Sequence, residues 1–385
     1  MVWISRGDGR LGFQVVGLVA TAIVMLSAQC SSTTDPTLLV SKQAEADSSP
    51  VTSTTGTRGA DALIIEATAA DGTTSTAGDS GEPRSTETTE TTERSDVSAD
   101  TSAEPSATEP SASSTQIMLR ERQGTFTFDP DGVGPDGGPI DVFYQRPPAG
   151  ELSTAPILIV MPGNSRTAAN YLDSWSEHAD EYGAVLLVPL FPRDRYDTGA
   201  YNRGNLLDAD GRPNRPERWT FAVIETLYAS VAEAIGSTTG GYHLYGHSAG
   251  AQFVHRFMLF MADHHVIRAV SANAGWYTVP DPGIAFPYGV AGGPSVSMTR
   301  ALREPLVILA GIGDDDPDAA GLRTTDEAGQ QGQTRYERAI HFYDKAKAAA
   351  DGAGVELRWT LHIVPGVAHS NHDMAPFAAK VLFNP

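Results

Sequence analysis

The residues that fix the architecture of this chain are Tyr242-His243-Leu244-Tyr245-Gly246-His247-Ser248-Ala249-Gly250. The first four predict a short buried strand, and the apolar stretch over 249–261 predicts a helix directly after it. Between them lies the pattern Gly-x-Ser-x-Gly, in which a serine occupies a sharp strand-to-helix turn whose strained backbone requires small neighbours. The turn presents the Ser248 hydroxyl above the sheet, and the N-terminus of the following helix favours negative charge there. Ser248 is therefore the predicted nucleophile.

Apolar runs and amphipathic stretches alternate on both sides of this segment. They predict strands at 156–161, 184–189, 242–245, 268–272, 305–310 and 355–364, and helices around 168–182, 220–235, 249–261, 334–350 and 374–383. Such alternation predicts an α/β fold with a mostly parallel, twisted sheet and helices on both faces. Ligand sites in these sheets lie at the carboxyl ends of the strands, so the residues after each apolar run are the candidates.

Carboxylates follow the predicted strand 305–310, in Gly311-Ile312-Gly313-Asp314-Asp315-Asp316-Pro317-Asp318. A carboxylate here would hold a catalytic imidazole in the correct tautomer. Asp314 is the first choice because of its spacing from Gly311, and Asp315 and Asp316 remain alternatives. The alternating aspartates lack the later glycine and the distal glutamate of an EF-hand loop, so we expect no metal site.

A histidine follows the last predicted strand, in Pro365-Gly366-Val367-Ala368-His369-Ser370-Asn371-His372. His369 is preferred over His372 as the general base because it comes directly after a small residue. The chain order Ser248, Asp314, His369 matches the Ser…Asp…His order of one hydrolase fold. No ligand set surrounds the two histidines in the sequence, and we expect neither a metal nor another cofactor.

The loop Pro162-Gly163-Asn164-Ser165-Arg166 follows the strand at 156–161 and could direct a backbone N–H at a substrate oxyanion. Asn164 is the first choice for this donor and Ser165 the second, with the N–H of Ala249 as the other donor. Trp276 and Tyr277 follow the strand at 268–272 and either line the cleft or pack beneath a loop. The long loop 190–217 and the Gly- and Pro-rich stretch 275–303 are candidates for its rim and lid.

These motifs together resemble the α/β-hydrolases of the serine esterase type, and most of all the polyhydroxybutyrate-depolymerase and feruloyl-esterase-like branch. The resemblance covers most of 140–385 and is carried by Pro162-Gly163-Asn164, Gly246 to Gly250, Gly311 to Pro317, and Gly366-Val367-Ala368-His369. It implies ester hydrolysis through an acyl-enzyme. Two departures are Pro162, which replaces the usual His before Gly163, and a lone cysteine, which cannot form an internal disulfide. A serine peptidase or amidase, or a non-catalytic surface binding protein, are the alternatives.

The first 30 residues predict a signal peptide. Arg6 and Arg10 precede an uncharged run of 18 residues, 11–28, that ends in small side chains. A retained transmembrane anchor is the alternative, because 18 residues just suffice to span a bilayer. Cys30 follows in a segment that resembles a bacterial lipoprotein signal, with Gln29 where a small residue is usual. We expect an exported protein, lipidated at Cys30 or cleaved after Ala28 and secreted.

Residues 31–115 predict a disordered, acidic spacer. They hold 35 Ser or Thr and no aromatic residue, too little apolar surface to offset the entropy of the chain. The whole chain has 47 acidic and 27 basic side chains, and its lack of Lys/Arg clusters argues against nucleic-acid binding. Residues 116–385 suit one catalytic domain. We expect a monomer that acts on a small-molecule or polymeric ester and meets a membrane only through its lipid anchor.

Overall fold

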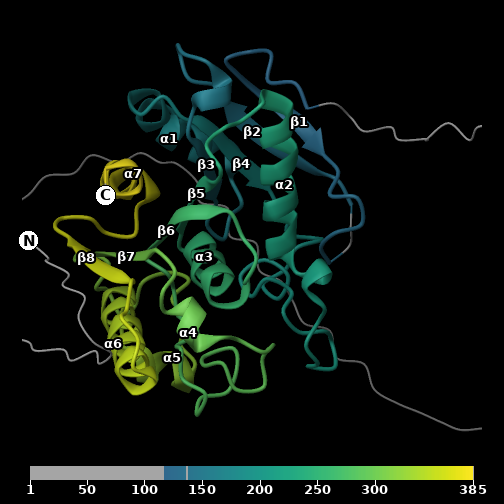
Figure 1. Ribbon diagram of the computed structural model, residues 1–385. Helices are drawn as coiled ribbons and strands as arrows, with labels where there is room; N and C mark the ends of the chain where they lie inside the picture. Colours follow the sequence, from purple (N-terminus) through teal and green to yellow (C-terminus); the bar gives the residue numbers. More distant parts are fainter. Residues whose placement is uncertain (1–116, 136–137, 385) are drawn as a thin grey trace, which may run out of the picture. The chain divides into compact units, whose positions relative to one another are not determined.

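A twisted sheet runs through the described part of the chain, which comprises residues 117–135 and 138–384 of the computed structural model (Figure 1). Within these residues eight strands form one sheet, in the order β1-β2-β4-β3-β5-β6-β7-β8. The strands are β1 (Gln123–Phe128), β2 (Ile140–Gln145), β3 (Ile157–Met161), β4 (Val185–Leu190), β5 (Tyr242–His247), β6 (Val266–Ala272), β7 (Leu306–Gly311) and β8 (Thr360–Val364). The predicted signal peptide, Cys30 and the spacer lie outside the described residues.

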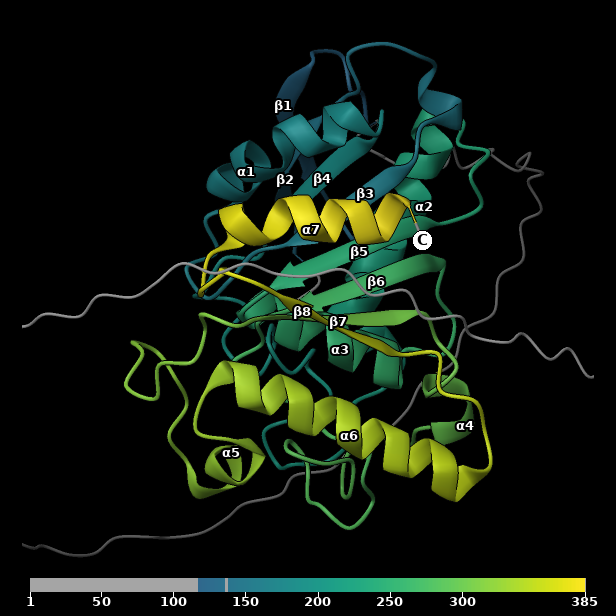
Figure 2. The same cartoon turned by 90° about the vertical axis from the view of Figure 1, so that its left-hand side faces the viewer.

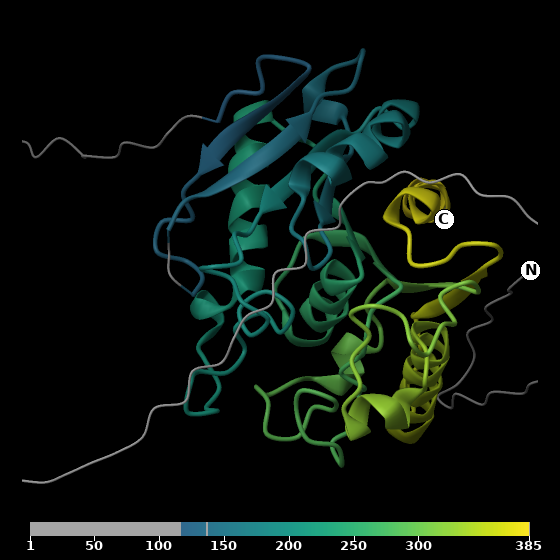
Figure 3. The same ribbon diagram turned by 180° about the vertical axis from the view of Figure 1, so that it is seen from behind.

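The six strands from β4 to β8 in this order are parallel, and β1 and β2 add an antiparallel pair at one edge (Figure 3). The predicted α/β fold with a mostly parallel sheet is therefore confirmed. The sequence did not predict β1 and β2. It also placed the last strand at 355–364, whereas β8 is shorter.

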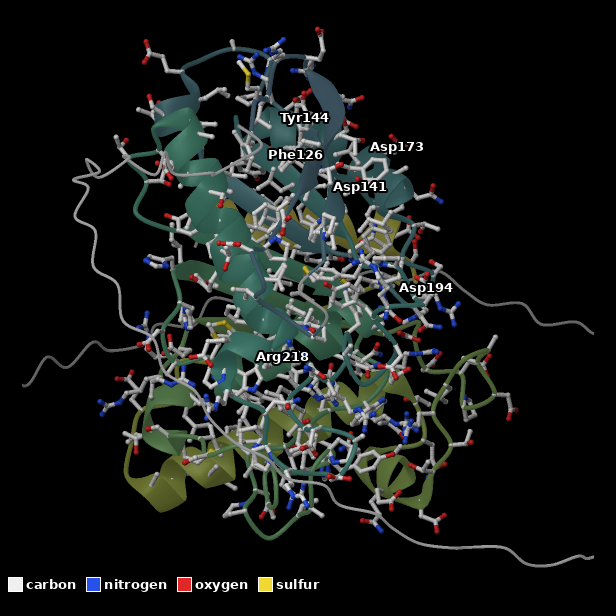
Figure 4. The ribbon with its side chains drawn as sticks, turned by 90° about the vertical axis from the view of Figure 1, so that its right-hand side faces the viewer. Phe126, Asp141, Tyr144, Asp173, Asp194 and Arg218 are labelled. Atoms are coloured by element: carbon white, nitrogen blue, oxygen red, sulfur yellow. The ribbon has the colours of Figure 1, made fainter. Side chains whose placement is uncertain are left out.

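The antiparallel edge is held by contacts across β1 and β2 (Figure 4). The rings of Phe126 and Tyr144 lie 6.0 Å apart, and the hydroxyl of Thr127 donates to Asp141 Oδ1 at 3.0 Å. Gly124 lies opposite Tyr144, whose ring fills the space that a side chain at 124 would need. This edge lengthens the sheet and contributes no residue to the cavity described below.

Helices cover both faces of the sheet, and α1 and α7 lie side by side over one of them (Figure 2). The helices α2, α3 and α6 belong to the other face, where α3 packs on β3, β5 and β6 and α6 packs on β7 and β8. The helices are α1 (Ala168–Glu181), α2 (Thr220–Ile235), α3 (Ala249–Phe260), α4 (Met298–Ala301), α5 (Asp326–Gln331), α6 (Arg335–Ala353) and α7 (Asn371–Phe383). No helix in the described ranges is long and apolar enough to cross a membrane.

Strand β3 shows how the two layers arise from the sequence. Its residues are all buried, and successive side chains point to opposite faces. Ile157, Ile159 and Met161 pack in the core beneath α2, α3 and α6, whereas Leu158 and Val160 pack in the core beneath α1 and α7. The continuous apolar run is therefore what a strand buried on both faces requires. The parallel pairing of β3 with β5 places the carboxyl ends of these two strands side by side.

Candidate active site

Ser248 occupies the sharp turn between β5 and α3. Its backbone has φ 58° and ψ −113°, a conformation that costs energy for any residue with a side chain. A Cβ on Gly246 would lie 2.2 Å from the oxygen of Gly250, and one on Gly250 would lie 2.0 Å from the oxygen of Met161. Both flanking positions thus have room for glycine alone, and the turn presents the Ser248 hydroxyl at the carboxyl edge of the sheet.

A continuous chain of hydrogen bonds starts at this hydroxyl. Ser248 Oγ lies 3.0 Å from His369 Nε2, and His369 Nδ1 lies 2.7 Å from Asp314 Oδ2. The three side chains come from the loops after β5, β8 and β7, all of which leave the sheet at its carboxyl edge. The structure therefore brings together all three residues that the sequence suggested as nucleophile, base and acid.

The rival candidates lie elsewhere. Asp314 is 3% exposed, whereas Asp315 and Asp316 point into solvent on the same loop. His372 is exposed in the first turn of α7 and makes no contact with the hydrogen-bonded chain. Among the described residues no group of three His, Cys, Asp or Glu side chains is placed to hold a metal.

Asn273, directly after β6, joins the loops that carry the acid and the base. Its Oδ1 accepts from the N–H of Gly311 at 2.8 Å, and its Nδ2 donates to the oxygen of Ala368 at 2.9 Å. The N–H of Gly313 also donates to the oxygen of Val367 at 2.9 Å. These bonds fix the separation of Asp314 and His369. This role could not be predicted from the sequence, because it depends on three loops that are distant along the chain.

The carbonyl groups of the loop after β3 are held from one side. The oxygen of Pro162 accepts from the hydroxyl of Tyr201 at 2.7 Å. Arg166 Nη1 donates to the oxygens of Gly163 and Asn164 at 3.1 and 3.0 Å, and its guanidinium stacks 3.5 Å from the centre of the Tyr201 ring. In a trans peptide the C=O and the next N–H point in opposite directions. The N–H groups of Asn164 and Ser165 therefore point away from Arg166.

A cavity of about 510 Å³ opens over Ser248, a volume typical of small-molecule sites. Trp276 lines this cavity, which was one of the two alternatives that the sequence left open. Tyr277 does not line it, because its ring is fully buried and stacks on Phe342 with centroids 4.4 Å apart. The lining residues fall on the loops after the strands and on the start of α3: Gly163, Asn164, Ser165, Tyr171, Thr198, Asn202, His247, Ser248, Ala249, Gln252, Gly275, Trp276, Ala320, Gly321, Arg323, Arg335 and His369.

Parts of the two long connections reach this cavity. Thr198 and Asn202 belong to the loop 190–217, and Gly275 and Trp276 belong to the stretch 275–303. Sequence reasoning did not single out Arg323 and Arg335, which lie beyond the acid loop. Arginine in a loop or at a helix start is common on protein surfaces, so the sequence carried no signal for them.

His247 is a second buried imidazole beside the hydrogen-bonded chain. Its ring centroid lies 4.7 Å from that of His369, and its Nδ1 lies 3.2 Å from the hydroxyl of Tyr171. Burial, with a smaller contribution from the charge of His369, holds the pKa of His247 well below its usual range. Burial also raises the pKa of Tyr171 to about 12. Both side chains are therefore neutral near pH 7, and His247 adds no positive charge next to His369.

The fold and this edge of the sheet define an α/β-hydrolase of the serine hydrolase class. No protein-family model and no curated protein matches the chain. Among solved structures, poly(aspartic acid) hydrolase-1 from Sphingomonas sp. KT-1 is similar, with 37% identity, a TM-score of 0.65, and coverage of 69% of this chain and 100% of that one. A poly(3-hydroxybutyrate) depolymerase from Bordetella parapertussis is 30% identical with a TM-score of 0.62, over 68% of this chain and 90% of that one.

The chain belongs to the family of these two enzymes, the polyhydroxybutyrate-depolymerase-like branch of the α/β-hydrolase serine esterases. It is an enzyme, a serine hydrolase of the carboxylic ester hydrolase type. The resemblance suggested by the sequence motifs is thereby confirmed.

Proposed function

We propose that Ser248, His369 and Asp314 form a catalytic triad that hydrolyses carboxylic esters through an acyl-enzyme. The observation that carries this proposal is the unbroken chain from Ser248 Oγ through His369 to the buried carboxylate of Asp314, with bonds of 3.0 and 2.7 Å. The 3.0 Å contact suits proton transfer from Ser248 to His369, and the 2.7 Å contact suits the orientation of the imidazole by an ionised Asp314. The chain opens into a cavity large enough for an ester of several carbons.

In the first step Ser248 Oγ attacks the carbonyl carbon while His369 Nε2 takes the hydroxyl proton. The new C–O bond turns the carbonyl oxygen into an oxyanion. His369, now positively charged, is stabilised by Asp314, which stays ionised and fixes the tautomer that donates from Nδ1. When the tetrahedral intermediate collapses, His369 Nε2 gives its proton to the leaving alcohol and the acyl group stays on Ser248.

The oxyanion is stabilised by backbone N–H groups of Ala249 and Asn164, with Ser165 as the alternative to Asn164. Ala249 is the first residue of α3, where the N–H groups of a helix have no partner within the helix. Loss of one such donor typically lowers kcat by about 10²–10³-fold. Water then attacks the acyl-enzyme, with His369 as base once more, and releases the acid.

The decisive experiment compares wild type with Ser248→Ala on 4-nitrophenyl butyrate and on a fluorophosphonate probe. Wild type should hydrolyse the ester and take up the probe covalently at Ser248. The alanine variant should keep its fold by circular dichroism and lose both. Labelling that persists in Ser248→Ala, or a wild type without either activity, contradicts the proposed triad.

An amidase is the second candidate, because the similar enzyme from Sphingomonas is a hydrolase of poly(aspartic acid), whose units are joined by amide bonds. The same triad can cleave either bond. Matched 4-nitrophenyl ester and 4-nitroanilide substrates with one acyl group distinguish the two. A kcat/KM that is higher for the anilide would replace the esterase proposal by the amidase.

Export is proposed from the charged start, the uncharged run at 11–28 and Cys30. The expected product is a cell-surface lipoprotein attached through Cys30, or a secreted enzyme cleaved after Ala28. Mass spectrometry of the mature N-terminus separates them. A diacylglyceryl-modified Cys30 supports the anchor, an unmodified Gln29 supports secretion, and an intact residue 1 contradicts both.

A further inference from the structure

The cavity over Ser248 is basic, although the chain as a whole is acidic. Arg323 and Arg335 line it, and none of its lining residues is Asp or Glu. Two more arginines lie directly behind the lining: Arg166 Nη2 donates to Asn202 Oδ1 at 3.4 Å, and Arg256 Nη1 donates to the oxygens of Asn202 and Gln252 at 2.9 Å. The carboxylate of Asp314 is already bonded to Arg335 and His369.

Three of these arginines have no carboxylate partner among the described residues: Arg166, Arg256 and Arg323. Arg256 is fully buried, and its Nη2 has no hydrogen-bond partner there. Arginine keeps its proton in proteins, so each contributes a positive charge that carbonyl groups and aromatic rings compensate only in part. Buried charges of this kind are normally paired. An anion in the cavity would supply the missing partner.

Arg323 is the arginine that is free to touch a ligand. Its Nε donates to the hydroxyl of Tyr288 at 2.5 Å, and its guanidinium lies 5.0 Å from the centre of the Trp276 ring. Its backbone oxygen accepts from Arg338 Nη2 at 2.8 Å. The two terminal nitrogens, Nη1 and Nη2, have no partner in the described part of the chain. One edge of the guanidinium is thus fixed, while the fork that suits a carboxylate is unused.

We propose that the substrate carries a carboxylate in addition to the bond that is cleaved, and that the Nη1/Nη2 fork of Arg323 binds it. The inference rests on the proposed function, because the carboxylate belongs to the molecule whose carbonyl Ser248 attacks. Trp276 supplies an apolar wall beside this fork, and Tyr288 holds the guanidinium in place. The preferred substrates are monoanionic esters of dicarboxylic acids, or polymers with carboxylates along the chain.

Arg335 does not compete for this role. Its Nη1 donates to Asp314 Oδ1 and its Nη2 to the oxygen of Ala320, both at 3.2 Å. Its side chain is 4% exposed. Arg335 therefore contributes positive potential to the cavity, whereas Arg323 contributes open donors.

The test uses pairs of substrates that differ only in one charge. Monomethyl and dimethyl esters of the C4 to C8 dicarboxylic acids are compared by methanol release at low salt. Wild type should have the higher kcat/KM for the monomethyl ester at one or more chain lengths. Arg323→Gln should lower that value by about 10–100-fold, as expected for loss of a charge-assisted hydrogen bond. The dimethyl esters should lose less, because they do not use the interaction, so the ratio of the two kcat/KM values should fall.

Two further variants sharpen the result. Arg323→Lys keeps the charge but not the fork, and should restore part of the preference. Arg303→Gln removes the same charge from an exposed residue that precedes β7, at the opposite end of the sheet from Ser248, and should behave as wild type. The preference of the wild type for the monomethyl ester over the dimethyl ester should also fall as salt is added.

The outcomes separate this inference from the proposed function. A wild type that prefers the dimethyl ester at every length, or an Arg323→Gln that lowers both kinds of ester equally, overturns the carboxylate site and leaves the esterase intact. A wild type that cleaves neither kind of ester, while the fluorophosphonate probe also fails, overturns the triad itself.

Discussion

Arg335 forms an ion pair with Asp314, Nη1 to Oδ1 at 3.2 Å, in which the side chains are only 4% and 3% exposed. The other oxygen of the same carboxylate, Oδ2, accepts from His369. Each oxygen of Asp314 therefore has its own donor, and the carboxylate cannot rotate without the loss of both bonds. His369, the proposed general base, is oriented by a group that is itself fixed by a residue of α6.

Asp314→Asn should lower kcat by about 10⁴-fold, because an amide can hold the imidazole in the wrong tautomer. Asp315→Asn, on the same loop but exposed, should change kcat by less than about threefold. Steady-state kinetics on 4-nitrophenyl butyrate measures both. Equal losses in the two variants would show that the acid is not Asp314.

Arg335→Met should destabilise the fold by about 3–5 kcal/mol, because it leaves the buried charge of Asp314 without its partner. Thermal or urea unfolding measures this loss. The double variant Asp314→Asn/Arg335→Met should be more stable than the sum of the single changes predicts, since the neutral amide no longer needs a cation. Additive losses would mean that the two residues act independently.

Arg166→Met should lower kcat by about 10–100-fold with a small change in KM, because the loop from Pro162 to Asn164 loses the donor that holds its carbonyl groups. Tyr201→Phe removes the bond to Pro162 alone and should have a smaller effect. Unfolding curves are needed beside the kinetics. A raised KM at constant kcat would instead indicate a role in binding the ground state.

Gly250→Ala should prevent folding or reduce soluble yield severely, because its Cβ would lie 2.0 Å from the oxygen of Met161 in the adjacent strand. Gly352→Ala is the matched control. Gly352 lies in α6 with open space around its missing Cβ, and alanine there should stabilise the fold by about 0.5–1 kcal/mol. A soluble, active Gly250→Ala enzyme would mean that β3 and the nucleophile turn are less tightly packed than described.

His243 on β5 should make the fold less stable in acid. Burial, reinforced by the charge of Arg268, lowers its pKa to about 4 from an ordinary value near 6.5. Between these values the unfolded chain binds a proton that the folded chain does not, so stability falls as the pH drops through this window. At pH 5 the loss from this residue is about 2 kcal/mol at most.

His243→Gln should therefore lose less stability than wild type between pH 7 and pH 5. Urea unfolding at the two pH values gives the difference for each protein, and the exposed His372→Gln serves as the matched control. Identical losses in wild type and His243→Gln would show that His243 already binds its proton in the folded state.

The sequence predicted the parts of the fold that local pattern governs. A continuous apolar run such as 157–161 predicts a strand that is buried on both faces of a sheet. The pattern Gly-x-Ser-x-Gly predicts a turn that has no room for side chains at its two glycines. The choice of Ser248, Asp314 and His369 then followed from the expectation that ligand sites lie at strand ends, and their order matched that of one hydrolase fold. Strand β1 was not predicted because QGTFTF is polar on its exposed face and contains a glycine. The need for that glycine is evident only from the Tyr144 ring that lies opposite it.

The supporting residues of the site could not be predicted in the same way. Asn273 matters because its amide reaches the loops after β7 and β8, and Arg335 because α6 places it against Asp314. Both depend on contacts between segments far apart in the sequence. Tyr277 is the opposite case, a residue that the sequence suggested for the cavity but that packs into the core. It follows the cavity-lining Trp276 directly, yet its ring stacks on Phe342.

The residues proposed to react and several of the residues that line the cavity lie in different kinds of segment. Ser248, Asp314 and His369 sit within a few residues of strand ends, whereas Thr198, Asn202 and Arg323 lie farther along long connections. Substrate preference can therefore diverge by exchange of whole connections while the reacting centre stays unaltered. Relatives that share the sheet and its turns need not share a substrate, and grafting the 190–217 or 317–325 segments between them offers a route to new selectivity.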